Sequence, residues 1–113
     1  MSYKHIIDRI PDSAFIWYDR DPAILVDYNG NRWFLATDVA RALGHNNYER
    51  AINTHLKQTD YKRLGQIRHT IVSKMPIRMR DDFRFLNDNG VYHMIIKSVR
   101  KPYAKELIEK YFD

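Results

Sequence analysis

Short blocks of apolar residues, separated by turn-forming residues, fill the first third of the chain. Residues 14–18 and 23–27 are rich in Phe, Ile, Trp, Leu and Val, and the four residues between them are Asp, Arg, Asp and Pro. Asn29-Gly30 follows, a pair that readily takes the positive backbone angles of a tight hairpin loop. We therefore expect residues 14–18 and 23–27 to form a hairpin through the turn at residues 19–22. The Asn29-Gly30 turn then leads into residues 32–36 as a third strand.

After the third strand the pattern changes to that of a short helix. Thr37 is a candidate N-cap, Asp38 lies where the helix dipole favours a negative charge, and Gly44 is suited to end the helix. These signals predict a helix over residues 38–43.

A second amphipathic helix is predicted directly after this one. Asn46, with Glu49 three residues later, resembles a capping box. One face of the helix is then an apolar stripe at helical spacing, made of Tyr48, Ala51, Ile52, His55 and Leu56. The opposite face is polar and carries Asn47, Glu49, Arg50, Asn53, Thr54 and Lys57.

The second half of the chain gives weaker signals up to residue 86. We assign strands to residues 68–73 and 84–86, and a turn to residues 87–90, whose Asn or Asp can cap a short buried helix over residues 91–98. Lys101-Pro102 starts a last helix, because Pro suits the first helical position and Ala104, Leu107, Ile108 and Tyr111 follow at helical spacing. No Gly or Asn caps the far end of this helix, so we expect residues 1–113 to be one domain of a longer protein.

These elements predict an α+β fold. A small antiparallel sheet would pack with the pair of helices after residue 37 and with two C-terminal helices, and Trp33, Phe34, Val39, Leu43 and Tyr92 would belong to its core. The chain of 113 residues has room for one domain, and 44% hydrophobic residues suffice for a core. It has no cysteine, which excludes disulfides and thiolate zinc sites, and no apolar stretch long enough to span a membrane. We expect a soluble, intracellular protein.

The net charge of +5 is concentrated in the middle of the chain. Residues 37–69 carry six basic and three acidic side chains, and residues 70–101 carry seven and three, whereas both ends have a slight acidic excess. The basic residues are interleaved with apolar periodicity. They therefore indicate basic faces on folded elements and an anionic partner, rather than a flexible basic tail.

The two predicted helices after residue 37, joined by Gly44-His45-Asn46, have the outline of a helix-turn-helix unit. Asn47 and Asn53 can present a donor and an acceptor to a base edge, and Arg50 can make a bidentate contact. Other basic side chains, such as those of Arg41 and Lys57, can hold phosphates. Two short amphipathic helices joined through Gly also occur in domains that bind nothing.

Two separated segments resemble motifs of the Bro-N domain of baculovirus repeated-ORF proteins and phage antirepressors. Residues 33–45, with Asn46-Asn47-Tyr48 after them, are similar to its opening motif. Residues 85–98 and 101–105 are similar to its strand, its Asn-x-x-Gly turn, its Tyr-containing apolar helix and its Pro-x-Ala helix. The resemblance covers residues 14–112, but residues 59–83 match no motif. It implies a viral or phage nucleic-acid-binding module without catalysis, in the host nucleus or a cytoplasmic virus factory.

We therefore expect DNA, double- or single-stranded, as the partner and transcription or replication as the regulated process. The candidate DNA-binding residues are Arg41, Asn46, Asn47, Tyr48, Arg50, Asn53, Lys57, Arg68, Lys97, Arg100 and Lys101. Single-stranded nucleic acid would need exposed aromatic rings for stacking, for which Tyr48, Tyr61 and Tyr103 are candidates. A homodimer would raise the affinity of so small a domain.

Two other classes of function are considered beside nucleic-acid binding. An antirepressor-type module would bind a protein partner through an aromatic surface instead of through charge. Catalysis and cofactors are not expected, since the five histidines lie at least ten residues apart and no Gly-rich phosphate loop is present. Asp81-Asp82 with Asp60 or Asp88 could hold magnesium, but a charge-balanced turn beside Arg80 and Arg84 is the simpler interpretation.

Overall fold

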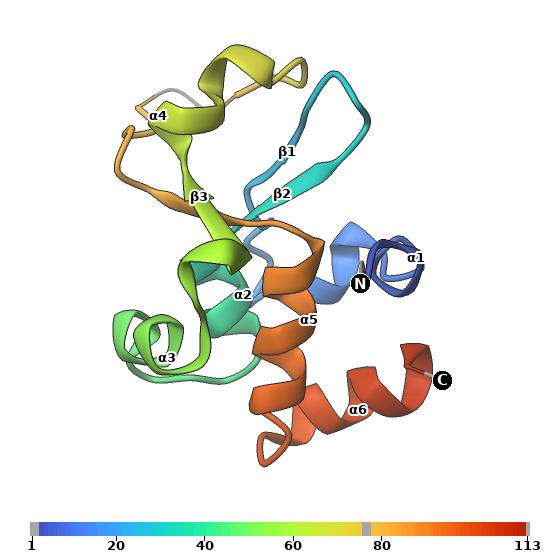
Figure 1. Cartoon of the computed structure of the whole chain (residues 1–113). Coiled ribbons are helices and arrows are strands. Elements are labelled where there is room, and N and C mark those ends of the chain that lie inside the picture. The colour runs from blue at the N-terminus through green and yellow to red at the C-terminus, as the bar shows by residue number, and fades with distance from the viewer. Residues whose placement is uncertain (1–2, 76–77, 113) are drawn as a thin grey trace.

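A four-stranded antiparallel sheet lies between two groups of helices in the computed structural model, which describes residues 3–75 and 78–112 (Figure 1). The spatial order of the strands is β1-β2-β4-β3. In chain order they are β1 (Ile24–Val26), β2 (Arg32–Leu35), β3 (Tyr61–Arg63) and β4 (Arg84–Leu86). The strands are short, so the fold depends on what packs against each face of the sheet.

Helices supply that packing. The α-helices are α1 (Lys4–Ile7), α2 (Ala36–Ala42), α3 (Tyr48–His55), α4 (Leu64–Ile67), α5 (Asp88–Lys97) and α6 (Pro102–Tyr111). Short 3-10 turns are η1 (Asp12–Phe15), η2 (Gln58–Asp60) and η3 (Arg68–Thr70). In Figure 1, α5 runs through the lower half of the molecule with α3 to one side and α1 to the other, and α4 lies at the opposite end. The predicted α+β class is confirmed.

Alternation along the strands gives the sheet two buried faces. Phe34 and Leu86 point into the larger core, where they meet buried residues of α1, α2, α3, α5 and α6. Leu25 and Phe85 point into a smaller core on the other face, closed by Leu64 and Ile67 of α4. Of the five predicted core residues, Phe34, Val39 and Leu43 are fully buried, while Trp33 and Tyr92 are partly buried against the two cores.

The loop between β1 and β2 is organised by a buried carboxylate. Asp27 is 6% exposed, and its Oδ1 accepts hydrogen bonds from the backbone N–H groups of Asn29 and Asn31. Its Oδ2 accepts from Trp33 Nε1 at 3.0 Å. Gly30 has a φ of +80° and Asn29 keeps a negative φ, so the Asn-Gly pair marks the predicted turn with only one residue in the left-handed region.

The strand predicted over residues 14–18 is wrong. Residues 12–15 form η1 instead, and Trp17 and Arg20 pair with each other across a tight turn, not with β1. Tyr18 and Asp19 hold this turn with φ values of 45° and 63°. The segment is apolar, as a strand would be, but Trp17 and Arg20 make their backbone hydrogen bonds with each other and not with a neighbouring strand. The predicted third strand is β2, and it pairs with residues 24–26 as expected.

The middle of the chain differs from the prediction as well. Residues 68–73 do not form a strand, because residues 68–70 form η3 and Ile71 makes only an isolated bridge to Asp27. The edge strand is β3, which pairs with β4 through Tyr61 opposite Leu86 and Arg63 opposite Arg84. A three-residue strand with two cations gives no apolar signal, so the sequence could not reveal it.

The helix starts are shifted from their predicted positions. α2 begins at Ala36, so Thr37 is inside the helix and is not its N-cap. The N-cap of α3 is Asn47, whose side chain accepts from the Arg50 N–H, and not Asn46. Residues 87–90 are the first turn of α5, which Asn87 caps through the Gly90 N–H. None of the helices in residues 3–75 and 78–112 has the length and apolarity needed to cross a membrane.

Candidate nucleic-acid interface

α2 and α3 pack against each other across a tight turn. Gly44 has a φ of +93°, and the Gly44 and His45 N–H groups donate to the last carbonyls of α2. This left-handed residue ends α2 as predicted and redirects the chain into α3. In α3 the inner residues Ala51 and Ile52 are 6% and 1% exposed. The arrangement matches the predicted helix-turn-helix outline.

The crest of α3 is polar and faces solvent. It consists of Glu49, Arg50, Asn53 and Thr54, all of which are exposed. Since Ala51 and Ile52 hold the helix down on the opposite side, the crest is available to a macromolecular partner.

One flank of α3 borders an open hollow of about 310 Å3, which we call the α3 groove. It is lined by His45, Asn46, Asn47, Arg50, Ala51, Thr54, His55 and Lys101. Four of the eleven predicted DNA-binding residues therefore meet here: Asn46, Asn47, Arg50 and Lys101. Within residues 3–75 and 78–112, neither Arg50 nor Lys101 has a carboxylate partner, so both cations remain available to an anionic ligand.

Two histidines line the bottom of the α3 groove. His45 Nε2 lies 2.7 Å from Ser98 Oγ, and the two imidazole rings are 5.7 Å apart. Burial lowers the pKa of His45, and Lys101 and His55 lower it further. Burial also lowers the pKa of His55, with Lys97 adding to the effect. Burial and the neighbouring cations therefore disfavour the protonated form of both rings, and the permanent positive charge of the groove comes from Arg50 and Lys101.

Asn47 and Asn53 were expected to offer both a donor and an acceptor to a base edge, but in each of them the acceptor oxygen already has a partner in the protein. Asn47 Oδ1 accepts the Arg50 N–H at 3.0 Å, and Asn53 Oδ1 accepts from Arg84 at 2.8 Å. Both amide oxygens thus already accept a hydrogen bond from the protein, and the Nδ2 groups remain as the donors for contact with a base. No described residue accepts a hydrogen bond from the Arg50 guanidinium, so its donors are available to a ligand.

The other predicted residues are distributed over several surfaces. Arg41 pairs with Asp38 at 2.9 Å and lies over the Tyr48 ring, so it stabilises the α2–α3 contact. Lys97 donates to the His55 carbonyl at the edge of the groove. Arg68 pairs with Asp81 beside α4, at the other end of the molecule from α3. The structure does not bring Arg68 together with the α3 groove.

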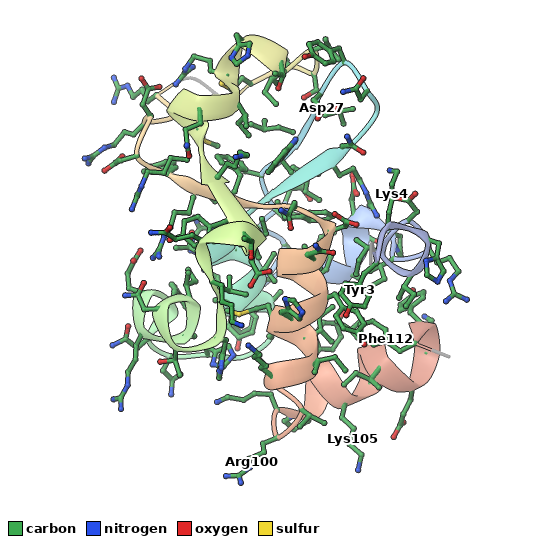
Figure 2. All side chains as sticks on the ribbon, viewed as in Figure 1. Tyr3, Lys4, Asp27, Arg100, Lys105 and Phe112 are labelled. Atoms are coloured by element: carbon green, nitrogen blue, oxygen red, sulfur yellow. The ribbon has the colours of Figure 1, made fainter. Side chains whose placement is uncertain are left out.

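Two predicted cations remain unpaired near α3 and α5. Lys57 follows α3 and is exposed. Arg100 projects away from the turn between α5 and α6, as Figure 2 shows. Neither has a carboxylate partner in the described part of the chain, and both add positive charge to this side of the molecule.

Sequence reasoning missed four residues that line the α3 groove: the polar residues His45, Thr54 and His55, and Ala51, which was predicted for the apolar stripe of the helix. Thr54 was placed on the polar face of the helix, but without a role. The sequence did contain a signal for the two histidines. His45 lies in the turn before α3 and His55 is the last residue of α3, so both were expected near this helix. The contact of His45 with Ser98, the residue that follows α5, could not be predicted from the sequence.

The aromatic residues considered for base stacking are all packed. Tyr48, Tyr61 and Tyr103 pack against the larger core, and the guanidinium groups of Arg41 and Arg84 lie over the first two rings. Tyr103 donates its hydroxyl to the Ala14 carbonyl. The strongly exposed aromatic side chains are instead those of Tyr18 and Tyr28, at 82% and 65%.

The Asp81-Asp82 pair considered for magnesium is paired with arginines. Asp81 accepts from Arg68 and Asp82 from Arg80, at 2.8 Å and 3.0 Å. Among the described residues, no three acidic or histidine side chains come together in a way that could hold a metal ion. The geometry at Asp81 and Asp82 is that of a charge-balanced turn.

Fold and site together define a small α+β protein with a helix-turn-helix-like pair and a basic groove beside its second helix. The family model described as "BRO family, N-terminal domain" matches residues 23–112. The chain therefore belongs to the Bro-N family, in agreement with the resemblance of its two motifs.

One curated relative is an uncharacterized protein of Haemophilus influenzae. It is 33% identical over 99 residues, which are 87% of this chain and 44% of the relative. The chain thus spans less than half the length of that protein. No solved structure matches the chain.

Proposed function

We propose that this domain binds double-stranded DNA, with the crest of α3 facing the major groove and the α3 groove beside a phosphate backbone. The observation that supports this most directly is that Arg50 and Lys101 lie together along one flank of an exposed polar helix, where neither has a carboxylate partner among the described residues. Membership of the Bro-N family supports the same class of function.

The roles of the side chains follow from their positions. Lys101, Lys57 and Arg100 would contact phosphates, which provide most of the affinity of a protein for DNA but carry no sequence information. Arg50 lies on the crest and can reach O6 and N7 of a guanine. Asn47 and Asn53 would act as donors through Nδ2, since Oδ1 of each is engaged.

Fluorescence anisotropy with labelled duplex and single-stranded oligonucleotides, at low and moderate salt, tests this proposal. The duplex should bind more tightly than the single strand, because the three tyrosines considered for stacking on bases are packed against the larger core. The variant Arg50→Ala/Lys101→Ala should weaken duplex binding through both changes. It should reduce the magnitude of the log–log salt slope by about 0.9, the value for the one phosphate neutralisation lost with Lys101.

The matched control is Lys105→Ala/Lys110→Ala, which removes the same charge from exposed positions on α6. It should leave duplex binding close to that of the unaltered protein. Equal losses in both variants would mean that only net charge matters, and absence of duplex binding at low salt would overturn the proposal.

A second candidate is a protein-binding module of the antirepressor type. The turn from Trp17 to Arg20 favours it, because Tyr18 is 82% exposed on a turn that holds two non-glycine residues at positive φ. Such strained, exposed turns occur at binding sites. If neither oligonucleotide binds, the variant Tyr18→Ala should weaken capture of a protein partner without lowering thermal stability.

A further inference from the structure

A second hollow, of about 480 Å3, lies on the other flank of α3. We call it the arginine cavity, after Arg63, Arg80 and Arg84, which line it. The start of α2 contributes Thr37, and α3 contributes Glu49 and Asn53. None of the three arginines belongs to the Bro-N motifs or to the predicted DNA-binding residues.

The helical geometry of α3 places the two hollows on opposite sides of its crest. At 3.6 residues per turn, Glu49 and Asn53 share one side of the crest, and Arg50 and Thr54 share the other. The first pair lines the arginine cavity and the second pair lines the α3 groove. The exposed helix is thus flanked by cations on both sides.

The three arginines differ in what they can still bind. Arg84 has an 11% exposed side chain, donates to Asn53 and Glu49, and lies over the Tyr61 ring. It neutralises Glu49 and fixes α3 to β4, so it is a positioning residue. Among the described residues, the Arg63 guanidinium donates to the Asp82 carbonyl alone and the Arg80 guanidinium to the Asp82 carboxylate alone. Since each guanidinium has five N–H donors, both keep donors for an anion.

The backbone around Arg63 and Arg80 is held in place. The Leu64 and Gly65 N–H groups donate to the carbonyls of Phe83 and Asp81, at 2.9 Å and 3.0 Å. A Cβ on Gly65 would lie 3.1 Å from Asp81 Cβ, so glycine permits this close approach. The two arginines are therefore presented from anchored segments.

The chain segment that supplies the arginines of the arginine cavity, residues 61–84, is strongly basic. Residues 61–84 carry seven basic and two acidic side chains, an excess equal to the net charge of the whole chain. The stretch that matches no motif is thus the one that supplies the positive charge beside the arginine cavity.

We infer that the arginine cavity holds a backbone phosphate of bound DNA through Arg63 and Arg80, on the side of α3 opposite to Lys101. This inference rests on the proposed function. A helix in the major groove, which is about 12 Å wide, lies between two phosphate backbones. Lys101 and the α3 groove serve one backbone, and the arginine cavity serves the other.

The test compares duplex binding of the unaltered domain with that of two double variants, Arg63→Ala/Arg80→Ala and Arg50→Ala/Lys101→Ala. The control is again Lys105→Ala/Lys110→Ala, and circular dichroism establishes that each variant is folded. Because Arg63 also contacts the Asp82 carbonyl, the single variant Arg80→Ala, at a 72% exposed side chain, provides a readout that leaves this contact intact.

Arg63→Ala/Arg80→Ala should weaken duplex binding and reduce the magnitude of the salt slope by about 0.9, the value for one phosphate, and Arg80→Ala alone should produce a smaller change in the same direction. Duplex binding that depends on Arg50 and Lys101 but is unchanged in both cavity variants would overturn the inference and leave the proposed function standing. Loss in the cavity variants alone would support the cavity and contradict the α3 groove. Absence of duplex binding by the unaltered domain would overturn both.

Discussion

At the scale of single residues, the buried polar groups define the local structure most sharply. Asp27 joins the loop backbone to Trp33, and Asp60, 2% exposed, accepts the Lys57 N–H and lies 2.9 Å from His93 Nδ1. A Cβ on Gly90 would lie 2.1 Å from the Asp60 carbonyl oxygen, so α5 can approach η2 only at a glycine. These contacts connect the loops to the two cores.

Asp27→Ala should lower the free energy of unfolding by about 2 kcal/mol at pH 7, because it removes an acceptor of three hydrogen bonds. Burial by itself raises the pKa of Asp27, but the hydrogen bonds from Trp33, Asn31 and Asn29 together outweigh burial and leave the pKa below 3.8. The stabilisation is therefore present above this unfolded value and is lost as the pH falls through the folded one. Urea denaturation should show the variant's deficit shrinking at acidic pH, and a constant deficit would contradict this role.

The histidines of the α3 groove predict a pH dependence of DNA binding. The folded protein keeps the pKa values of His45 and His55 below 6.5, mainly through burial and then through Lys101 and Lys97. A nearby phosphate favours the protonated rings, so duplex binding should tighten by roughly two- to fivefold per histidine between about pH 7.5 and about pH 5.5. His45→Gln/His55→Gln should flatten this profile. An unchanged profile in that variant would place the phosphates elsewhere.

At the scale of elements, helix caps fix where the functional helix begins. Asn47→Ala should cost about 1 kcal/mol in the free energy of unfolding, because it removes the acceptor for the Arg50 N–H. Asn46→Ala is the matched control, since Asn46 is exposed and caps nothing, and it should change stability by less than about 0.5 kcal/mol. Chemical denaturation of both variants measures the difference. Equal costs would contradict the observed cap.

Element by element, the sequence predicts those parts of the fold whose signal is local. Gly44 ends α2 and Pro102 starts α6, as the pattern indicates. The predicted stripe of α3 faces the core through Tyr48, Ala51, Ile52 and Leu56, whereas its fifth member, His55, lines the α3 groove. The strand predicted at residues 14–18 failed because two residues at positive φ turn the chain back on itself. β3 was missed because its pairing with β4 is decided by tertiary contacts, and Arg63 and Arg80 were missed as site residues for the same reason.

At the scale of the whole molecule, an aromatic stack joins the two ends of the chain. Tyr92 of α5 stacks between Tyr3 and Phe112, with ring centroids at 3.7 Å and 5.0 Å. In Figure 2 both labelled rings lie beside α5, where the N-terminal and C-terminal segments meet. The stack leaves the α2–α3 unit on the far side of α5, away from both described ends.

Tyr92→Ala should lower the free energy of unfolding by about 3 kcal/mol, because it removes a packed ring together with its stacking contacts to Tyr3 and Phe112. Tyr28→Ala removes a ring that is 65% exposed and should cost less than about 0.5 kcal/mol. Urea denaturation of the two variants gives the comparison. A small cost for Tyr92→Ala would mean that the chain ends are held by other contacts.

Chemical-shift mapping by NMR, with isotope-labelled domain and an unlabelled duplex, tests the central claim most directly. The largest backbone shifts should fall on Asn46, Asn47, Arg50, Thr54 and Lys101, and α6 should be little changed. Shifts confined to the Tyr18 turn or to α6, with α3 unperturbed by a duplex that binds, would contradict this claim.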